Sequence, residues 1–160
     1  MCLYTQRDIL ITYLQGDATS PIHDGQIIIP HICNDKGRWG AGFVLALSKR
    51  WAKPEAGYRC LKDYRLGDVQ FYTVEKDILV ANMIAQHDTK QWRGISPIRY
   101  ESLAICLHTV NVLAESITGG CSVHMPKIGA GLAGGDWGVI ERIINSMVMV
   151  PCYVYEYNGG

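Results

Sequence analysis

Residues 122–137 have the sequence SVHMPKIGAGLAGGDW, in which an apolar segment, 122–128, leads into a glycine-rich loop. The apolar segment is typical of a buried strand. Beyond the loop, apolar residues recur at helical spacing and predict a helix over residues 137–148. The loop therefore joins the end of a strand to the start of a helix, and this unit indicates an α/β fold.

Residues 31–42, with the sequence HICNDKGRWGAG, form a second connection of the same kind. The apolar segment 26–33 predicts a strand that is buried on both faces, and helical spacing predicts a helix over 42–51. Pro30 cannot donate a hydrogen bond to a neighbouring strand, so we expect a bulge or an edge-facing position there. Both glycine loops thus follow a strand and precede a helix.

The position of these loops points to an anion. A helix start leaves backbone N–H groups unpaired and slightly positive, and glycines let that backbone approach an anion closely. Two such loops at one edge of a sheet would form a cradle for phosphates, at the place where open α/β sheets bind ligands. The alternative is that both loops are only tight turns, and their matched positions favour the cradle. Neither loop has the ending of a Walker A motif or the Rossmann fingerprint with its later acidic residue.

The rest of the chain alternates predicted strands with predicted helices. Residues 75–77 look like a hairpin turn, and an apolar stripe from Leu103 to Ala114 predicts a long helix. This alternation predicts a three-layer α/β/α sandwich with a mixed sheet, as a single domain over residues 1–160. The further predicted strands are 9–14, 68–74, 78–84 and 150–157, and the further predicted helix runs from Pro54 to about Tyr64.

The composition fits a folded protein without a strongly charged surface. The 160 residues are 48% hydrophobic, and 15 Lys and Arg balance 15 Asp and Glu. This excludes a disordered, charge-rich chain and disfavours a nucleic-acid binder with a broad basic face. No apolar run is long enough to span a bilayer, and the N-terminus lacks the pattern of a signal peptide, so we expect a cytoplasmic protein.

The cysteines and histidines indicate neither a disulfide framework nor a metal site. The cysteines form no C-x-x-C pair, and we expect reduced thiols, mostly in the core. His31 and His124 lie in predicted strands, where a lone histidine is more often a core residue than a ligand. We therefore expect no metal and no cofactor. The six cysteines are Cys2, Cys33, Cys60, Cys106, Cys121 and Cys152.

With these loops the chain resembles a macrodomain, the ADP-ribose-binding fold. The resemblance rests on QGDAT (15–19), HICN (31–34) with the glycines at 40 and 42, IRYESL (98–103) and MPKIGAGL (125–132). It covers nearly the whole chain and is strongest to the branch with the ADP-ribose-1''-phosphate phosphatase and the terminal ADP-ribose glycohydrolases. It implies a sheet of about six mixed strands, with ADP-ribose across the strand ends and its diphosphate against both loops.

The resemblance also implies which residues bind the substrate. Asp17, beside Ala18, corresponds to the residue that accepts from the exocyclic amine of adenine, and the alternative is that Asp17 stabilises its own turn. Asn34 corresponds to a polar residue against the distal ribose, and the alternative is an Asx-type turn. Trp39 would form a wall of the pocket or pack the loop against the helix. The other expected contacts are Gly40, Ala41, Gly42, Gly129, Ala130, Gly131, Leu132, Ala133 and Gly134.

Asn34 and Asp136 are the candidate catalytic residues. Asp136 is expected beside the distal ribose, where it would activate a water molecule, and the alternative is that it caps the following helix. Some relatives attack through a lysine, but Gln86 stands at that position here, and an amide cannot form the covalent adduct. Lys90 follows a few residues later, and nothing in the spacing requires it to reach the site. We therefore expect water activation without a lysine adduct.

These features predict a hydrolase that binds an ADP-ribose derivative and cleaves a bond at the distal ribose. The candidate substrates are ADP-ribose 1''-phosphate, O-acyl-ADP-ribose and an ADP-ribosylated macromolecule. One alternative is a non-catalytic ADP-ribose reader, which the missing lysine favours. Another is a different nucleotide-binding α/β domain. The sequence leaves open the preferred leaving group, the physiological substrate and the oligomeric state.

Overall fold

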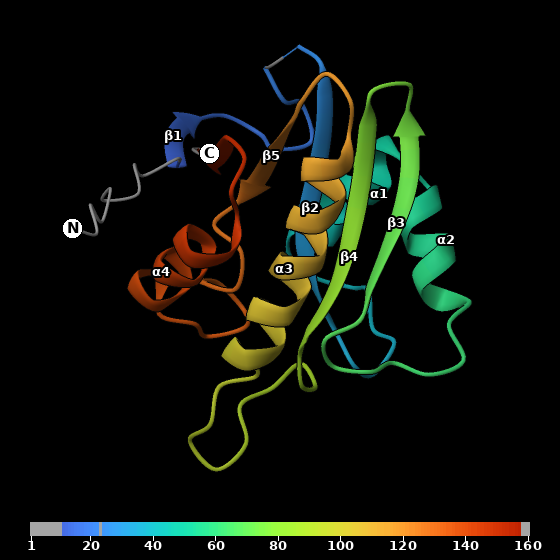
Figure 1. Ribbon diagram of the computed structural model, residues 1–160. Coiled ribbons are helices and arrows are strands. Elements are labelled where there is room, and N and C mark those ends of the chain that lie inside the picture. Colours follow the sequence, from blue (N-terminus) through green and yellow to red (C-terminus); the bar gives the residue numbers. More distant parts are fainter. Residues whose placement is uncertain (1–10, 23, 158–160) are drawn as a thin grey trace, which may run out of the picture.

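The strands form one mixed six-stranded sheet in the order β1-β6-β5-β2-β4-β3 (Figure 1). The computed structural model describes residues 11–22 and 24–157. Neighbouring strands pair in parallel, except that β3 is antiparallel to β4. Residues 9 and 10 of the predicted strand 9–14 lie outside the described residues. The strands are β1 (Ile11–Gln15), β2 (Gln26–Asn34), β3 (Val69–Glu75), β4 (Ile78–Gln86), β5 (Cys121–Pro126) and β6 (Cys152–Glu156).

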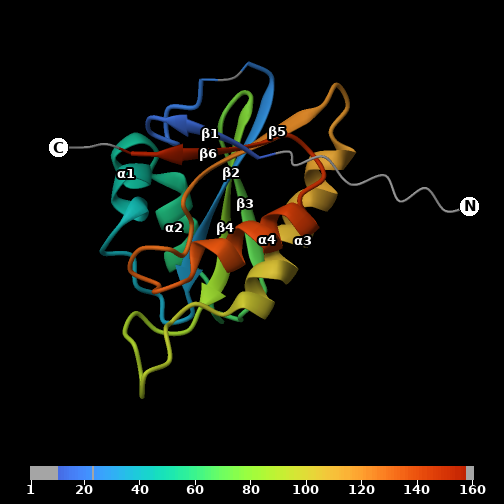
Figure 2. The same ribbon diagram turned by 90° about the vertical axis from the view of Figure 1, so that its left-hand side faces the viewer.

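Two helices cover each face of the sheet, as Figure 2 shows. Side chains alternate along β2, so Ile28 lies in the core with α3 and α4, whereas Ile27 and Ile29 lie in the core with α1 and α2. This confirms the predicted three-layer α/β/α sandwich with a mixed sheet of six strands. The helices are α1 (Phe43–Arg50), α2 (Lys53–Arg59), α3 (Tyr100–Ser116) and α4 (Trp137–Met147).

The structure has no bulge at Pro30, so that alternative is wrong, but one side of β2 has no paired strand at this residue, which agrees with the expected edge-facing position. The register of β2 with β4 runs through Pro30 and its partner Ala81 without a shift. On the other side, β2 pairs with β5 only over residues 26–28. The strand therefore has no β5 ladder at Pro30 that a missing N–H could interrupt.

The helix predicted from Pro54 to about Tyr64 ends earlier, at Arg59. The chain folds back there, and the Tyr64 hydroxyl donates to the backbone carbonyl of Tyr58 at 3.1 Å. The predicted hairpin turn is confirmed, because Glu75 at the end of β3 pairs with Ile78 at the start of β4.

The parallel strands bring both glycine loops to one edge of the sheet. The first loop follows β2 and leads to α1, and the second follows β5 and leads to α4. Of the described cysteines, Cys60 is exposed, the other four are buried free thiols, and Cys2 lies outside the described residues. None of the described helices combines the length and apolarity that crossing a membrane requires.

Candidate functional site

A cleft lies between the two glycine loops at the carboxyl edge of the sheet. It consists of a larger hollow of about 650 Å³ and a smaller hollow of about 250 Å³, which share Gly42, Phe43 and Pro126. A Cβ atom on Gly42 would lie 3.5 Å from the side chain of Leu132 in the other loop. The two loops therefore lie side by side, as the sequence predicts.

Unpaired backbone amides characterise the smaller hollow. Among residues 11–22 and 24–157, the amides of Gly131, Leu132 and Ala133 donate to no protein acceptor, and neither do those of Ala41 and Gly42. Such amides at strand-to-helix turns attract anions, because several N–H dipoles point to one place. The smaller hollow thus has the electrostatics of a phosphate site.

The predicted loop residues fall into two groups. Gly40, Ala130 and Gly134 belong to the loops but do not line either hollow, and the amide of Gly134 closes a turn by donating to the carbonyl of Gly131 at 3.0 Å. The predicted loop residues that do line the smaller hollow are Ala41, Gly42, Gly129, Gly131, Leu132 and Ala133.

Gly129 sets the depth of the second loop. Its φ of +72° is in the left-handed region, and a Cβ atom there would lie 2.4 Å from the Cδ1 atom of Ile98. A side chain at this position would both strain the backbone and collide with the core. The loop can therefore approach the sheet this closely only with glycine at residue 129.

Asp17 lines the larger hollow and also stabilises its own turn. Its Oδ1 atom accepts from the amide and the hydroxyl of Thr19, each at 2.8 Å. Its Oδ2 atom has no partner among the described residues, and Ala18 lines the hollow beside it. The two roles that the sequence suggests for Asp17 are thus compatible, since each uses a different oxygen.

Tyr155 and Tyr157 line the same hollow, because alternate residues of a strand share a face. The Tyr155 side chain is buried, and its hydroxyl bonds to the ring of His124 at 2.8 Å. The other ring nitrogen of His124 lies 2.9 Å from the Ser122 hydroxyl. His124 is therefore a core histidine, as predicted.

His31 is buried at the smaller hollow with one ring nitrogen unpaired. Its side chain is 1% exposed, and its Nε2 atom lies 2.5 Å from the Oδ1 atom of Asn82. Because the Asn82 amide nitrogen donates to the carbonyl of Pro54, Asn82 presents its oxygen to His31, so Nε2 carries the hydrogen. Burial lowers the pKa of His31 to about 4, against the opposing effect of the Asn82 hydrogen bond. The neutral ring then leaves Nδ1 as an acceptor without a partner in the described chain.

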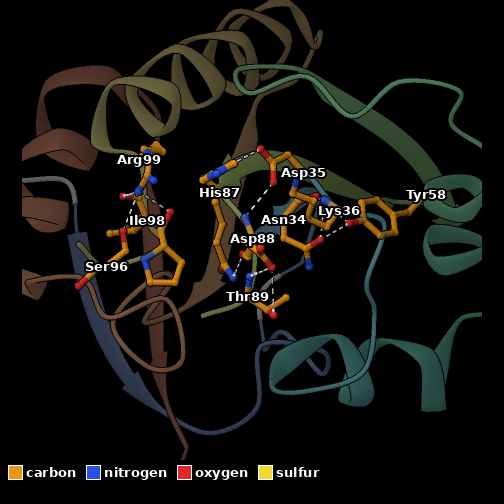
Figure 3. Close-up of polar contacts among 12 residues, drawn as sticks. Asn34, Asp35, Lys36, Tyr58, His87, Asp88, Thr89, Ser96, Ile98 and Arg99 are labelled. Atoms are coloured by element: carbon orange, nitrogen blue, oxygen red, sulfur yellow. Dashed lines mark hydrogen bonds and ion pairs between the residues drawn. The ribbon is translucent and has the colours of Figure 1, made fainter. Parts of the chain in front are cut away.

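Asn34 holds the first glycine loop together, as Figure 3 shows. Its Oδ1 atom accepts from the amides of Lys36 and Arg38, and its Nδ2 atom donates to the carbonyl of Arg38 at 2.7 Å. The Tyr58 hydroxyl donates to the Asn34 backbone carbonyl at 2.7 Å. The structure thus shows the turn that was the alternative for Asn34, and its contact with a ribose stays a prediction.

Trp39 packs beneath the first loop and does not line either hollow. Its side chain is 4% exposed, its ring contacts those of His31 and Tyr58, and its Nε1 atom donates to the Ser48 hydroxyl at 2.7 Å. The structure therefore shows the packing alternative for this residue. An apolar ring under the loop supports the loop from below.

Asp136 caps α4. Its Oδ1 atom accepts from the amides of Gly138 at 2.8 Å and Val139 at 3.4 Å, and its own amide donates to the Tyr100 hydroxyl. Asp136 is exposed and does not line either hollow. The capping role is what the structure shows, and the predicted activation of water by Asp136 has no support in these contacts.

Gln86 lines the smaller hollow at the end of β4, where lysine-dependent relatives would place their nucleophile. Its Nε2 atom donates to the backbone carbonyl of Asp88 at 2.8 Å. Lys90 does not line this hollow. No group of three or more potential metal ligands occurs in residues 11–22 and 24–157.

Two features of the site went unnoticed in the sequence. Phe43, the first residue of α1, lines both hollows, and its place directly after Gly42 was the available signal. The other feature is an ion pair between Asp35 and His87, 52 residues apart. Such a pair becomes visible only when β2 and β4 are known to be neighbours.

The chain is similar to curated proteins over most of its length. It is 30% identical to the ADP-ribose 1''-phosphate phosphatase of Candida albicans, over 91% of this chain and 99% of that protein. It is also 30% identical to the mouse chromodomain-helicase-DNA-binding protein 1-like, over 92% of this chain. The chain spans only 18% of the length of that relative. No protein-family model matches the sequence.

Solved structures show the same fold. A Streptomyces coelicolor macrodomain protein matches with a TM-score of 0.79 and 44% identity, over 91% of this chain and 98% of that one. A Bacteroides thetaiotaomicron protein of unknown function matches with a TM-score of 0.86 and 47% identity, over 91% of this chain and 96% of that one.

Proposed function

Because this chain belongs to the macrodomain family, we propose that it binds ADP-ribose or a derivative and hydrolyses a bond at the distal ribose. The observation that carries the proposal is the cleft itself. Two glycine loops with unpaired amides meet at the smaller hollow, and a larger hollow with a free carboxylate oxygen adjoins it. A nucleotide with a central diphosphate matches this order of groups.

The adenosine would occupy the larger hollow. The free Oδ2 atom of Asp17 would accept from the exocyclic amine of adenine, and Tyr155 would lie against the base. Guanine presents a carbonyl oxygen at the equivalent position, which a carboxylate repels. The larger hollow therefore favours adenine.

The diphosphate would lie across the smaller hollow. Amides of both loops would donate to its oxygens, which explains how a chain without net charge can bind a dianion. The distal ribose would then reach the end of this hollow near Gln86. An amide there cannot form a covalent adduct, so water must attack directly.

The alternative is a reader that binds ADP-ribose without chemistry. Two observations favour it: Asn34 and Asp136 are both engaged in holding the backbone, and Gln86 replaces the nucleophilic lysine. A reader would bind ADP-ribose at the same cleft. Turnover therefore separates the two functions, and binding alone does not.

The test has a binding arm and a turnover arm. Calorimetry with ADP-ribose, ATP and NAD measures whether the cleft selects ADP-ribose, and displacement by ATP at equal concentration would contradict the proposal. Release of phosphate from ADP-ribose 1''-phosphate, and of ADP-ribose from a modified protein, measures hydrolysis. Binding without release above the buffer rate would leave the reader.

A further inference from the structure

A third hollow, which we term the outer hollow, adjoins the cleft at the end of β4. Gln86 lines the smaller hollow, and the next residue, His87, lines the outer hollow. The two hollows therefore lie on either side of the end of β4. Its volume is about 510 Å³. The side chains that give it chemical character are Lys36, His87, Asp88, Lys90, Trp92 and Arg99.

His87 is held in one orientation by a largely buried carboxylate. Its Nδ1 atom lies 2.6 Å from the Oδ2 atom of Asp35, and Figure 3 shows the ring turned toward that carboxylate. The Asp35 side chain is 12% exposed, whereas that of His87 is 47% exposed. The Oδ1 atom of Asp35 accepts from the amide of Asp88 at 2.8 Å, so both carboxylate oxygens are occupied. With Nδ1 fixed by Asp35, the Nε2 atom of His87 is the nitrogen that can exchange a proton.

The backbone supports this pair from both strands. Asp35 directly follows β2 and His87 directly follows β4, and the amide of Asp35 donates to the carbonyl of Gln86 at 2.9 Å. Burial favours the neutral acid, but the hydrogen bonds from His87 and from the Asp88 amide outweigh it and lower the pKa of Asp35. Asp35 is therefore a carboxylate that accepts from Nδ1 of His87 and orients the imidazole.

Cationic side chains surround His87 in the outer hollow. Lys36 and Lys90 are exposed, and Asp88 is the carboxylate that opposes them there. The Nη1 atom of Arg99 donates to the carbonyls of Ser96, Pro97 and Ile98 at 2.7–3.1 Å, which fixes its guanidinium. Asp35 adds a second carboxylate, which interacts with His87 and Lys36. Three cations against two carboxylates still favour a negatively charged group in this hollow.

An exposed aromatic ring forms the outer wall. Trp92 is 63% exposed and pairs through its backbone with Ile95, and the guanidinium of Arg93 lies 4.5 Å from its ring. The loop that carries it projects beyond the sheet (Figure 1). The outer hollow thus has an exposed aromatic wall against which a bound group can pack.

Resting on the proposed function, we propose that the outer hollow takes an anionic group attached to the distal ribose and that His87, positioned by Asp35, is the general acid and base of the hydrolysis. His87 in its protonated form gives the Nε2 proton to the bridging oxygen, which leaves with the electron pair of the broken bond. A water molecule adds its oxygen to the electron-poor atom and returns a proton to Nε2. The products are the two hydroxyl-bearing fragments, and no oxidant or further reactant is consumed.

A purely structural role is the competing explanation for the pair. Asp35 and His87 would then only join the ends of β2 and β4, and their loss would lower the free energy of unfolding. Catalysis predicts instead a loss of kcat that a small molecule can replace. The volume of the outer hollow and the exposure of His87 leave room for free imidazole.

The experiment uses the full chain with ADP-ribose 1''-phosphate and with O-acetyl-ADP-ribose as probes. We expect His87→Ala to lower kcat by at least about 100-fold, to leave the Kd for ADP-ribose within twofold and to recover activity with added imidazole. Asp35→Asn lowers kcat without changing KM, and imidazole does not rescue it because the ring is still present. His108→Gln, on the exposed face of α3, is the matched control.

The outcomes separate the proposal from the function on which it rests. Absence of ADP-ribose binding by the unchanged protein overturns the proposed function. Binding without turnover by the unchanged protein leaves only the reader and overturns the hydrolysis together with the role of His87. Turnover by the unchanged protein with full kcat in a folded His87→Ala or His87→Gln protein overturns the role of His87 alone. The double substitution Lys36→Ala/Lys90→Ala should raise the KM for ADP-ribose 1''-phosphate more than the KM for O-acetyl-ADP-ribose. Equal effects on both probes overturn the assignment of the outer hollow to an anionic group.

Discussion

Replacement of Asp17 by asparagine tests the adenine site at a single atom. Oδ1 of Asp17 accepts two hydrogen bonds from Thr19, and an asparagine oxygen can accept both. The free Oδ2 atom becomes an amide nitrogen, which donates and therefore faces the adenine amine donor to donor. Asp17→Asn should weaken ADP-ribose binding while the turn stays intact.

The expected loss follows from the burial of Asp17. A hydrogen bond to a charged group contributes about 1.5–3 kcal/mol when buried, and Asp17 is half-buried, so we expect about 1–2 kcal/mol. This corresponds to a Kd that is about 5–30-fold higher. Calorimetry measures the affinity, and thermal unfolding shows whether the fold is intact.

GDP-ribose provides the opposite test. The new amide can donate to the carbonyl oxygen of guanine, so Asp17→Asn should narrow the preference for ADP-ribose over GDP-ribose. Asp63→Asn, at an exposed carboxylate outside the cleft, is the matched control. An unchanged Kd for ADP-ribose in a folded Asp17→Asn protein would refute the assignment of the larger hollow to adenine.

Three further substitutions test the supports of the cleft. Gly129→Ala should lower the free energy of unfolding by about 1–3 kcal/mol in urea titrations, because the new Cβ atom would collide with Ile98 and residue 129 has a positive φ. Gly131→Ala is the control, because a Cβ atom there meets nothing within 4 Å, and it should change the free energy of unfolding little. Equal stabilities of the two variants would contradict the steric argument. The pKa of His31 falls from 6.5 in the unfolded chain to about 4 in the folded protein. The stability that the neutral ring contributes is therefore fully present above pH 6.5. As the pH falls toward 4, the free energy of unfolding should decrease by up to about 3 kcal/mol. In urea titrations at pH 7 and pH 4.5, His31→Gln should reduce the difference in the free energy of unfolding between the two pH values. An unchanged difference would show that another group titrates. Asp136→Ala should lower the free energy of unfolding by about 1 kcal/mol, because the cap of α4 is lost. Asp136→Ser keeps a capping oxygen and should retain most of this stability, which thermal unfolding of the two variants measures.

The fold was predictable because its strands and loops carry strong local patterns. The buried strands β2 and β4 are nearly continuous apolar runs, as burial on both faces requires. For Pro30 the sequence left a bulge and an edge-facing position open, since a proline rule that considers one strand cannot know where the neighbouring β5 ladder stops. α2 likewise ends earlier than its sequence pattern predicts, at Arg59, and the Tyr64 hydroxyl, beyond that end, donates to the backbone carbonyl of Tyr58.

The site was predictable in its backbone and less so in its side chains. Gly131 and Gly42, whose amides have no acceptor among the described residues, line the smaller hollow because their place in the loops puts them there. The side-chain roles of Asn34 and Asp136 could not be decided from sequence, because a polar side chain at a strand end or a helix start can bond either to a backbone amide or to a ligand. In both residues the backbone amides are the observed partners.

A balanced net charge conceals where this molecule can attract an anion. The 15 basic and 15 acidic residues cancel over the whole chain, yet the cleft has amide donors that no count of side chains includes. The outer hollow adds three cationic side chains, which Asp88 and Asp35 oppose. Electrostatic attraction in this fold is therefore produced by placement at one sheet edge, where amides would hold a diphosphate and where Lys36, Lys90 and Arg99 would hold a charged group beyond it. Composition can exclude a broad basic face, but only topology can reveal two neighbouring anion sites of different construction.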